Sequence, residues 1–122
     1  IAAIVERGEE VVLVRNVGWP DTWYGLVSGF LEKGESPEEG IVREIEEELG
    51  VTAEVVSLVG AYGFAQMNQV IIAYHTRIAE DAELVLGDEL ADSKLVATAK
   101  LKPWPFGTGA AVRDWLAAYR DA

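Results

Sequence analysis

The chain has 122 residues, half of them apolar, no cysteine and a formal net charge of −11 at pH 7. This length and composition predict one globular domain over residues 1–122, and they exclude a disordered chain and a disulfide scaffold. The acidic balance argues against binding to a nucleic-acid backbone, which needs a basic surface. No apolar run approaches about 18 residues and no export signal is visible, so nothing indicates a membrane protein, and the lack of cysteine is compatible with the cytoplasm. Because a strand-like pattern opens directly at Ile1, we expect the native protein to begin earlier.

The first part of the chain predicts a β-hairpin. Residues 1–5 and 10–15 are rich in apolar and β-branched side chains, and Gly8 lies between them at the expected turn. A loop rich in glycine, proline and tryptophan follows, and a short strand is expected at 24–28. We expect Trp23 to pack in the core where that strand begins.

An acidic segment, residues 29–51, dominates the chemistry of the chain. It holds eight carboxylates and only two basic side chains. An N-cap, a proline at the first helical position and a capping-box acid are supplied by Ser36, Pro37 and Glu39. Gly50 is a typical helix end, so a helix is predicted at 37–49.

Apolar and acidic side chains fall on two adjacent faces of this helix. At roughly 100° per residue, the apolar face holds Ile41, Val42, Ile45 and Leu49. Glu44, Glu47 and Glu48 share the other face, where Gly40 leaves room for an approaching group. Converging carboxylates with few basic partners favour a hard divalent cation, Mg²⁺ or Mn²⁺. Zinc is disfavoured because the chain has no cysteine and a single histidine, and no EF-hand loop is present.

The second half of the chain predicts strands at 51–60, 69–78 and 93–97 and a helix at 109–120. A less regular stretch at 62–68 and an acidic loop at 80–92 separate the strands. The helix is expected to have Thr108 as its N-cap and an apolar stripe of Val112, Trp115, Leu116 and Tyr119. His75 is expected to be a half-exposed sheet residue rather than a general base. Strands interspersed with two helices predict an α/β fold, a mixed sheet between helices in an α/β/α sandwich.

The acidic segment matches the signature of a known family. Gly29, Glu35 and the run from Arg43 to Val51 fill every position of G-x5-E-x7-R-E-U-x-E-E-x-G-U, where U is aliphatic. This pattern is the Nudix box, and the chain resembles the Nudix (MutT-like) hydrolases. The resemblance implies metal-dependent hydrolysis of a nucleoside diphosphate linked to another moiety. It further implies Mg²⁺ or Mn²⁺ as cofactor and a small-molecule nucleotide as substrate, it is compatible with a homodimer, and no nucleic-acid or membrane partner is expected.

The resemblance also implies roles for individual residues. The metal ligands and catalytic carboxylates that it implies are the Ser28 carbonyl, Glu44, Glu47 and Glu48. Arg43 belongs to the catalytic machinery, and Glu35 pairs with it to brace the loop against the helix. One further carboxylate commonly comes from the acidic loop, where Glu89 is the first candidate and Glu83 the second. Either Glu44 or this loop carboxylate would take a proton from the attacking water.

Substrate contacts are expected outside the box. Arg15, at a strand end, either contacts a substrate phosphate or is an ordinary exposed residue. Trp19 either stacks on a base or covers apolar surface. The region in which Nudix substrate pockets often gain selectivity holds Phe64, Gln66 and Asn68. Residues 103–106 spell P-W-P-F, which marks the NADH pyrophosphatase branch. In that branch it lies soon after the box, so we expect a rigid loop here, with contact to the substrate as the alternative.

ADP-ribose or NADH is the first choice of substrate, because residues 26–30 resemble that branch. Nucleotide sugars, nucleoside triphosphates and dinucleoside polyphosphates are alternatives. Two non-enzymatic alternatives are a domain that only senses a nucleotide and an acidic helix that binds a basic protein. The intact box argues against the sensor, because a binding module does not need every metal-binding carboxylate. Metal dependence would separate catalysis from binding of a basic protein.

Overall fold

A computed structural model describes residues 1–121 of the chain, with side chains described through Tyr119. Within these residues the strands are β1 (Ala2–Arg7), β2 (Glu10–Asn16), β3 (Val27–Ser28), β4 (Glu54–Phe64), β5 (Gln69–Arg77) and β6 (Leu90–Ala97). The helices are α1 (Pro37–Leu49) and α2 (Gly109–Asp121), and the short 3₁₀ turns are η1 (Ala65–Met67) and η2 (Thr98–Lys100). In this part of the chain, no helix combines the length and the apolar character needed to cross a membrane.

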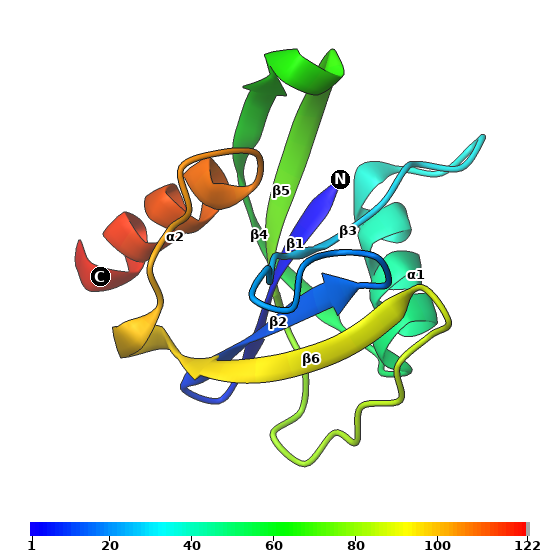
Figure 1. The fold of residues 1–122 in the computed structure, drawn as a ribbon, viewed down its shortest axis with the longest axis vertical. Helices are drawn as coiled ribbons and strands as arrows, with labels where there is room; N and C mark the ends of the chain where they lie inside the picture. The colour runs from blue at the N-terminus through cyan, green and yellow to red at the C-terminus, as the bar shows by residue number, and fades with distance from the viewer. Residues whose placement is uncertain (122) are drawn as a thin grey trace.

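The strands form one mixed sheet in the order β4-β5-β1-β2-β6, and β3 pairs with β1. β1 and β5 run parallel, whereas the other paired strands run antiparallel. α1 and α2 lie on opposite sides of the sheet, and the β4–β5 hairpin extends beyond both helices (Figure 1). This arrangement confirms the predicted α/β/α sandwich.

Strand β1 lies at the centre of the sheet and contributes to both cores. Ala2 and Ile4 belong to the cluster on the α2 face, whereas Ala3 and Val5 belong to the cluster on the α1 face. Successive side chains of a strand point to opposite faces, so a strand covered on both faces is apolar throughout. This explains why the start of the chain shows a continuous apolar run rather than an alternating pattern.

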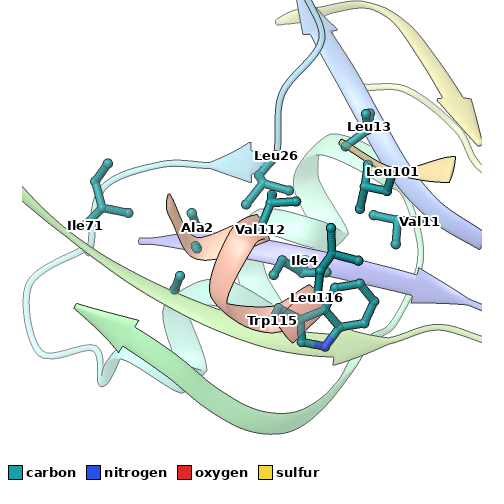
Figure 2. Close-up of a cluster of buried hydrophobic side chains, with 12 residues drawn as sticks. Ala2, Ile4, Val11, Leu13, Leu26, Ile71, Leu101, Val112, Trp115 and Leu116 are labelled. Carbon is teal, nitrogen blue, oxygen red and sulfur yellow. The ribbon is translucent and has the colours of Figure 1, made fainter. Parts of the chain in front are cut away.

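Each helix buries most of the stripe that its periodicity predicts, and Val42 of α1 is only partly buried against the same cluster. The buried residues are Ile41, Ile45 and Leu49 of α1 and Val112, Trp115 and Leu116 of α2. The α2 side chains meet Ala2, Ile4 and Leu26 in a continuous cluster (Figure 2). The prediction was wrong for Tyr119, which is 48% exposed. Its ring contacts Trp115, at 5.5 Å between centroids, but it lies outside the buried cluster.

Strand pairing moves several predicted boundaries. β4 continues to Phe64, past the expected end at residue 60, because it pairs with β5 along this whole length. β6 begins at Leu90 rather than at residue 93, because its pairing with β2 begins there. The strand expected at 24–28 shrinks to β3. In each case the partner strand decides the boundary, and local composition does not.

Two side chains differ from the prediction in their burial. Trp23 is 53% exposed, so the expectation that it packs in the core was wrong; Leu26 fills the core position instead. His75 is buried rather than half-exposed. Trp115 packs on the His75 ring, with 5.1 Å between the ring centroids. The Nε2 atom of His75 lies 3.0 Å from a carboxylate oxygen of Glu6.

Candidate active site

Local signals determine where α1 begins and ends. The Ser36 hydroxyl accepts a hydrogen bond from the Glu39 N–H at 3.2 Å, and the Glu39 carboxylate accepts one from the Ser36 N–H at 3.0 Å. This is a complete capping box, with Pro37 in the first turn. At the other end Gly50 is left-handed, with φ 68°, and donates to the Glu46 carbonyl. These ends agree with the predicted helix and determine which face presents the carboxylates.

The Arg43 guanidinium connects the acidic helix to the loop before it. Nε and one terminal nitrogen donate to the two oxygens of Glu35 at 2.6 and 2.9 Å, and the same terminal nitrogen donates to the Phe30 carbonyl at 3.0 Å. The other terminal nitrogen donates to Glu44 at 3.0 Å and to Glu47 at 3.2 Å. The Arg43 hydrogen bonds lower the pKa of Glu35 to about 2. Arg43 therefore holds the loop and two predicted metal ligands in one network.

The Glu44 side chain is buried against the first glycine of the box. A Cβ at Gly29 would lie 2.3 Å from both Cδ and Oε1 of Glu44, closer than such atoms can pack. A side chain at this position would have to displace the Glu44 carboxylate, which occupies that space. Ser28, the predicted backbone ligand, directly precedes this glycine at the end of β3 and thus lies beside the Glu44 carboxylate.

Glu48 lies one turn further along the helix and is also buried, at 7% exposure. Burial raises the pKa of Glu48 to about 7, and the neighbouring charges of Glu44, Glu89 and Glu47 add to the rise. Burial also raises the pKa of Glu44, although Arg43 opposes this. The carboxylates therefore lie close enough to repel one another. Such a cluster is unfavourable unless a proton or a cation neutralises it.

Glu89 lies near enough to Glu44 and Glu48 for its charge to raise their pKa values, and the loop that carries it packs on the end of α1. The Gly87 N–H donates to the Glu48 carbonyl at 2.9 Å. A Cβ at Gly87 would lie 2.6 Å from the Glu47 carbonyl oxygen, so the two backbones are in close contact. The Glu89 carbonyl in turn accepts a hydrogen bond from the Val17 N–H at 2.9 Å, which ties the β2–β3 loop to the same place.

The donor set fits a hard divalent cation. The candidate donors are all oxygens, from carboxylates and one carbonyl. Among the side chains that the structure describes, no group of three or more acidic, histidine or cysteine side chains already has the spacing of a coordination shell. The ion pairs of Arg43 with Glu44 and Glu47 explain this, since they hold those two carboxylates. A cation would compete with Arg43 for them and would relieve the repulsion at Glu48.

Arg15 lies at the end of β2 with most of its side chain buried. The side chain is 19% exposed, and its ion pair is a long one, 3.7 Å to Asp21, whose side chain is 98% exposed. Arg15 Nε is buried without a hydrogen-bond partner in the described part of the chain. A buried donor without a partner is costly, so an anionic oxygen would be favourable there. Contact of Arg15 with a substrate phosphate stays a prediction.

The other predicted substrate contacts are spread over two regions. Phe64 ends β4, and its ring lies 3.2 Å from the position of a Cβ at Gly107. Gln66 and Asn68 are exposed at the tip of the β4–β5 hairpin, which extends beyond both helices (Figure 1). Trp19 is partly buried in the β2–β3 loop. No contact of these residues with the carboxylates appears among the described interactions, so their roles stay predictions.

Sequence reasoning missed one pair of aromatic residues. Trp23 of the β2–β3 loop and Phe106 of the P-W-P-F segment have their ring centroids 6.1 Å apart, with an angle of 52° between the planes. Next to Trp23, Tyr24 donates to Asp92 at 2.5 Å, and Lys94 lies over the Tyr24 ring at 4.2 Å. The P-W-P-F segment was a visible signal for one partner, but the pairing itself depends on the tertiary structure.

Comparison with known proteins agrees with this geometry. A family model described as the NUDIX domain matches residues 1–117. The chain belongs to the Nudix family. The predicted membership of the Nudix hydrolases is thereby confirmed, and the acidic face of α1 with its Arg43 network is the Nudix box in three dimensions.

Relatives of this Nudix domain carry several names. The NAD-capped RNA hydrolase NudC of Pseudomonas putida is 31% identical over 104 residues, which cover 85% of this chain and 38% of that protein. The chain thus spans about two fifths of the length of the curated relatives it matches. Among solved structures, a UDP-X diphosphatase has a TM-score of 0.76 and 26% identity, covering 98% of this chain and 61% of that one. An ADP-ribose pyrophosphatase of Streptococcus suis has a TM-score of 0.77 and 20% identity, covering 98% and 89%, which shows a shared fold.

Proposed function

We propose that this Nudix domain hydrolyses the pyrophosphate link of a nucleoside diphosphate joined to another moiety, with Mg²⁺ or Mn²⁺ as cofactor. The observation that carries the proposal is the pair of buried carboxylates, Glu44 and Glu48. Glu44 packs against Gly29, and the charges of Glu44, Glu89 and Glu47 act on Glu48. Clustered acids with raised pKa values are typical of sites where a cation is bound and chemistry occurs. The complete box with its ion-pair brace supports a catalytic domain rather than a sensing one.

The residues of the site would have distinct roles. The groups that would hold the cation are the Ser28 carbonyl, Glu44, Glu47 and Glu48. When bound, a divalent cation would neutralise the pyrophosphate charge and make a water molecule at the site more acidic. Glu44 or Glu89 would accept the proton of that water. Arg43 keeps the box loop and the helix in position, and Arg15 would bind a phosphate oxygen.

ADP-ribose and NADH are the proposed first substrates. The resemblance of residues 26–30 to the corresponding branch supports this choice, as do two of the names above, an NAD-capped RNA hydrolase and an ADP-ribose pyrophosphatase. The UDP-X diphosphatase supports nucleotide sugars as the next class to test. The products would be a nucleoside monophosphate and a phosphorylated second moiety. The cytoplasm is the proposed location, in keeping with a chain that has no cysteine.

Hydrolysis of a substrate panel with Mg²⁺, with Mn²⁺ and with EDTA tests the proposal. The panel contains ADP-ribose, NADH, nucleotide sugars, dinucleoside polyphosphates and nucleoside triphosphates. We expect metal-dependent release of a nucleoside monophosphate from at least one of them. Glu48→Gln should lower kcat by about 100-fold or more, because loss of supporting residues alone costs metal sites about 10- to 100-fold. Glu46→Gln, an exposed carboxylate on the same helix, should retain activity within about twofold.

Two kinds of result would contradict the proposed metal-dependent hydrolysis. If no substrate is turned over under any metal condition while nucleotide binding is retained, the hydrolase proposal fails and the domain senses a nucleotide. If turnover survives EDTA, or if Glu46→Gln and Glu48→Gln lose activity equally, the carboxylate cluster does not hold a catalytic cation.

A further inference from the structure

We propose that Trp23, supported by Phe106, is the surface on which the base of the nucleotide stacks. The two residues are exposed by 53% and 54%, although they are among the largest apolar side chains of the chain. They come from loops about 80 residues apart in sequence, and their rings are in contact, with centroids 6.1 Å apart. This inference rests on the proposed function, since it names the part of the site that would bind the base of the substrate.

Both rings are presented by turns that are closed by backbone hydrogen bonds. The Trp23 N–H donates to the Pro20 carbonyl at 3.0 Å, and the Gly109 N–H donates to the Phe106 carbonyl at 3.1 Å. Pro105 restricts the backbone directly before Phe106. Rings held in place by such turns lose little conformational entropy when a ligand stacks on them. Their exposure therefore favours a preformed binding surface over an accident of the loops.

The Phe106 loop is also packed tightly on its inner side. A Cβ at Gly109 would lie 1.7 Å from the Trp104 carbonyl oxygen, so only glycine allows this path of the backbone. The Trp104 indole N–H donates to the Thr108 hydroxyl at 3.3 Å. Trp104 itself packs against the buried cluster under α2. Phe106 is thus the aromatic residue of this loop that is left facing outward, toward Trp23.

The loop that carries Trp23 is connected at both ends to residues of the candidate site. At its start, the Val17 N–H donates to the Glu89 carbonyl at 2.9 Å. At its end the chain runs through β3 to Gly29, against which the Glu44 carboxylate packs. Figure 1 shows this loop between α1 and the loop that leads into α2. A nucleotide with its pyrophosphate at the carboxylates would therefore have its base within this aromatic region.

The ring geometry indicates how a base would bind. With centroids 6.1 Å apart and planes tilted by 52°, the two rings are in contact and leave no room for a third ring between them. A base would stack on the free face of the Trp23 indole, while Phe106 would support that indole from the side. Stacking of this kind tolerates different bases, because every base has a π-face. The surface is uncharged, so it suits a neutral base, whereas the phosphates need a cation.

Equilibrium binding of AMP and of ribose 5-phosphate, with Mg²⁺ present, tests this proposal, because the two ligands differ only in the base. In the unmodified domain AMP should bind more tightly. Trp23→Ala should weaken AMP binding by about 30-fold, the middle of the range for base–aromatic stacking, and should leave ribose 5-phosphate binding unchanged. Phe106→Ala should act in the same direction with a smaller effect. Tyr119→Ala, at a similarly exposed aromatic residue on α2, should leave both ligands unchanged.

A conservative variant supplies a spectroscopic readout. AMP should quench tryptophan fluorescence of the unmodified domain, and Trp23→Phe should retain most of the affinity while losing most of the quenching. In turnover of the best substrate, Trp23→Ala should raise KM and leave kcat nearly unchanged. Circular dichroism confirms that each variant is folded.

Several results would overturn the stacking surface. These are equal loss of both ligands in Trp23→Ala, no change of AMP binding in that variant, and no preference for AMP, or no AMP binding at all, in the unmodified domain. The outcome is separate from that of the proposed hydrolysis. If AMP binds selectively but no substrate is hydrolysed, the stacking surface is supported and the proposed hydrolase activity is contradicted. If a substrate is hydrolysed but AMP is not preferred over ribose 5-phosphate, the hydrolase activity is supported and the stacking surface is contradicted.

Discussion

The Glu44 carboxylate fills the space that a side chain at Gly29 would need, with 2.3 Å between the position of a Cβ and the carboxylate carbon. A methyl group there must displace Glu44 or the backbone next to Ser28. We expect Gly29→Ala to lower kcat by about 100-fold, because a shift of about 1 Å in a catalytic group costs about that much. Steady-state kinetics with the best substrate measure this. Gly63→Ala is the matched control, since a Cβ at Gly63 meets nothing within 4 Å. Equal activity of the two variants would show that the close contact does not matter.

Arg43 should not be replaceable by lysine. Its fork makes a two-point ion pair with Glu35 and also reaches Glu44 and Glu47, which a single ammonium cannot reproduce. We expect Arg43→Lys to lower kcat by about tenfold or more through misplaced carboxylates. Arg113→Lys, at an exposed arginine of α2, should change kcat by less than about twofold. An unchanged kcat in Arg43→Lys would reduce the role of Arg43 to that of a simple positive charge.

Glu48 should make the metal-free domain less stable as the pH rises. Its pKa is about 7 in the folded state, against an ordinary value of 4.5 that applies when the chain is unfolded. Its favourable contribution to the free energy of unfolding is therefore fully present below about pH 4.5 and is lost as the pH rises through about 7. At about 1.4 kcal/mol for each pKa unit, the loss is at most about 3.5 kcal/mol. The raised pKa of Glu44 lowers the stability in the same direction as the pH rises.

Urea unfolding in EDTA between pH 4.5 and pH 8 measures this slope. Glu48→Gln should flatten it, and Glu46→Gln should leave it as it is. The lowered pKa of Glu35 does not interfere, because the stability it contributes is lost only as the pH falls from 4.5 toward about 2. If Glu48→Gln keeps the full slope, the Glu48 carboxyl is ionised in the folded domain at neutral pH.

Arg15 should affect substrate binding more than the chemical step. Its Nε is buried without a partner in the described part of the chain, and its ion pair with Asp21 is long and exposed. A substrate phosphate bound by the guanidinium would form hydrogen bonds between charged groups, which contribute about 1.5–3 kcal/mol. We therefore expect Arg15→Gln to raise KM by about 10- to 100-fold while kcat changes little. Asp21→Asn should leave both constants unchanged. A fall in kcat at constant KM would place Arg15 in the chemical step.

The helix of the Nudix box and most of its chemistry can be predicted from residue spacing alone. The capping residues, the terminal Gly50 and the apolar stripe of α1 act within a few residues of one another, so their effect can be read directly from their spacing. The helical period then places Glu44, Glu47 and Glu48 on one face. Pairing of Glu35 with Arg43 followed from the family resemblance, and the structure contains that pair.

Only the tertiary structure decided the parts of the site that depend on distant segments. Glu89 joins the cluster because the backbone at Gly87 packs on the end of α1, and its sequence alone does not distinguish it from the other acids of that loop. Trp23 is exposed whereas Leu26 is buried in the core, and Phe106, about 80 residues away in sequence, lies beside Trp23. Strand limits likewise followed the partner strand. Hydrogen bonds within a helix depend on neighbours in sequence, whereas burial and strand pairing depend on whichever segments the fold brings together.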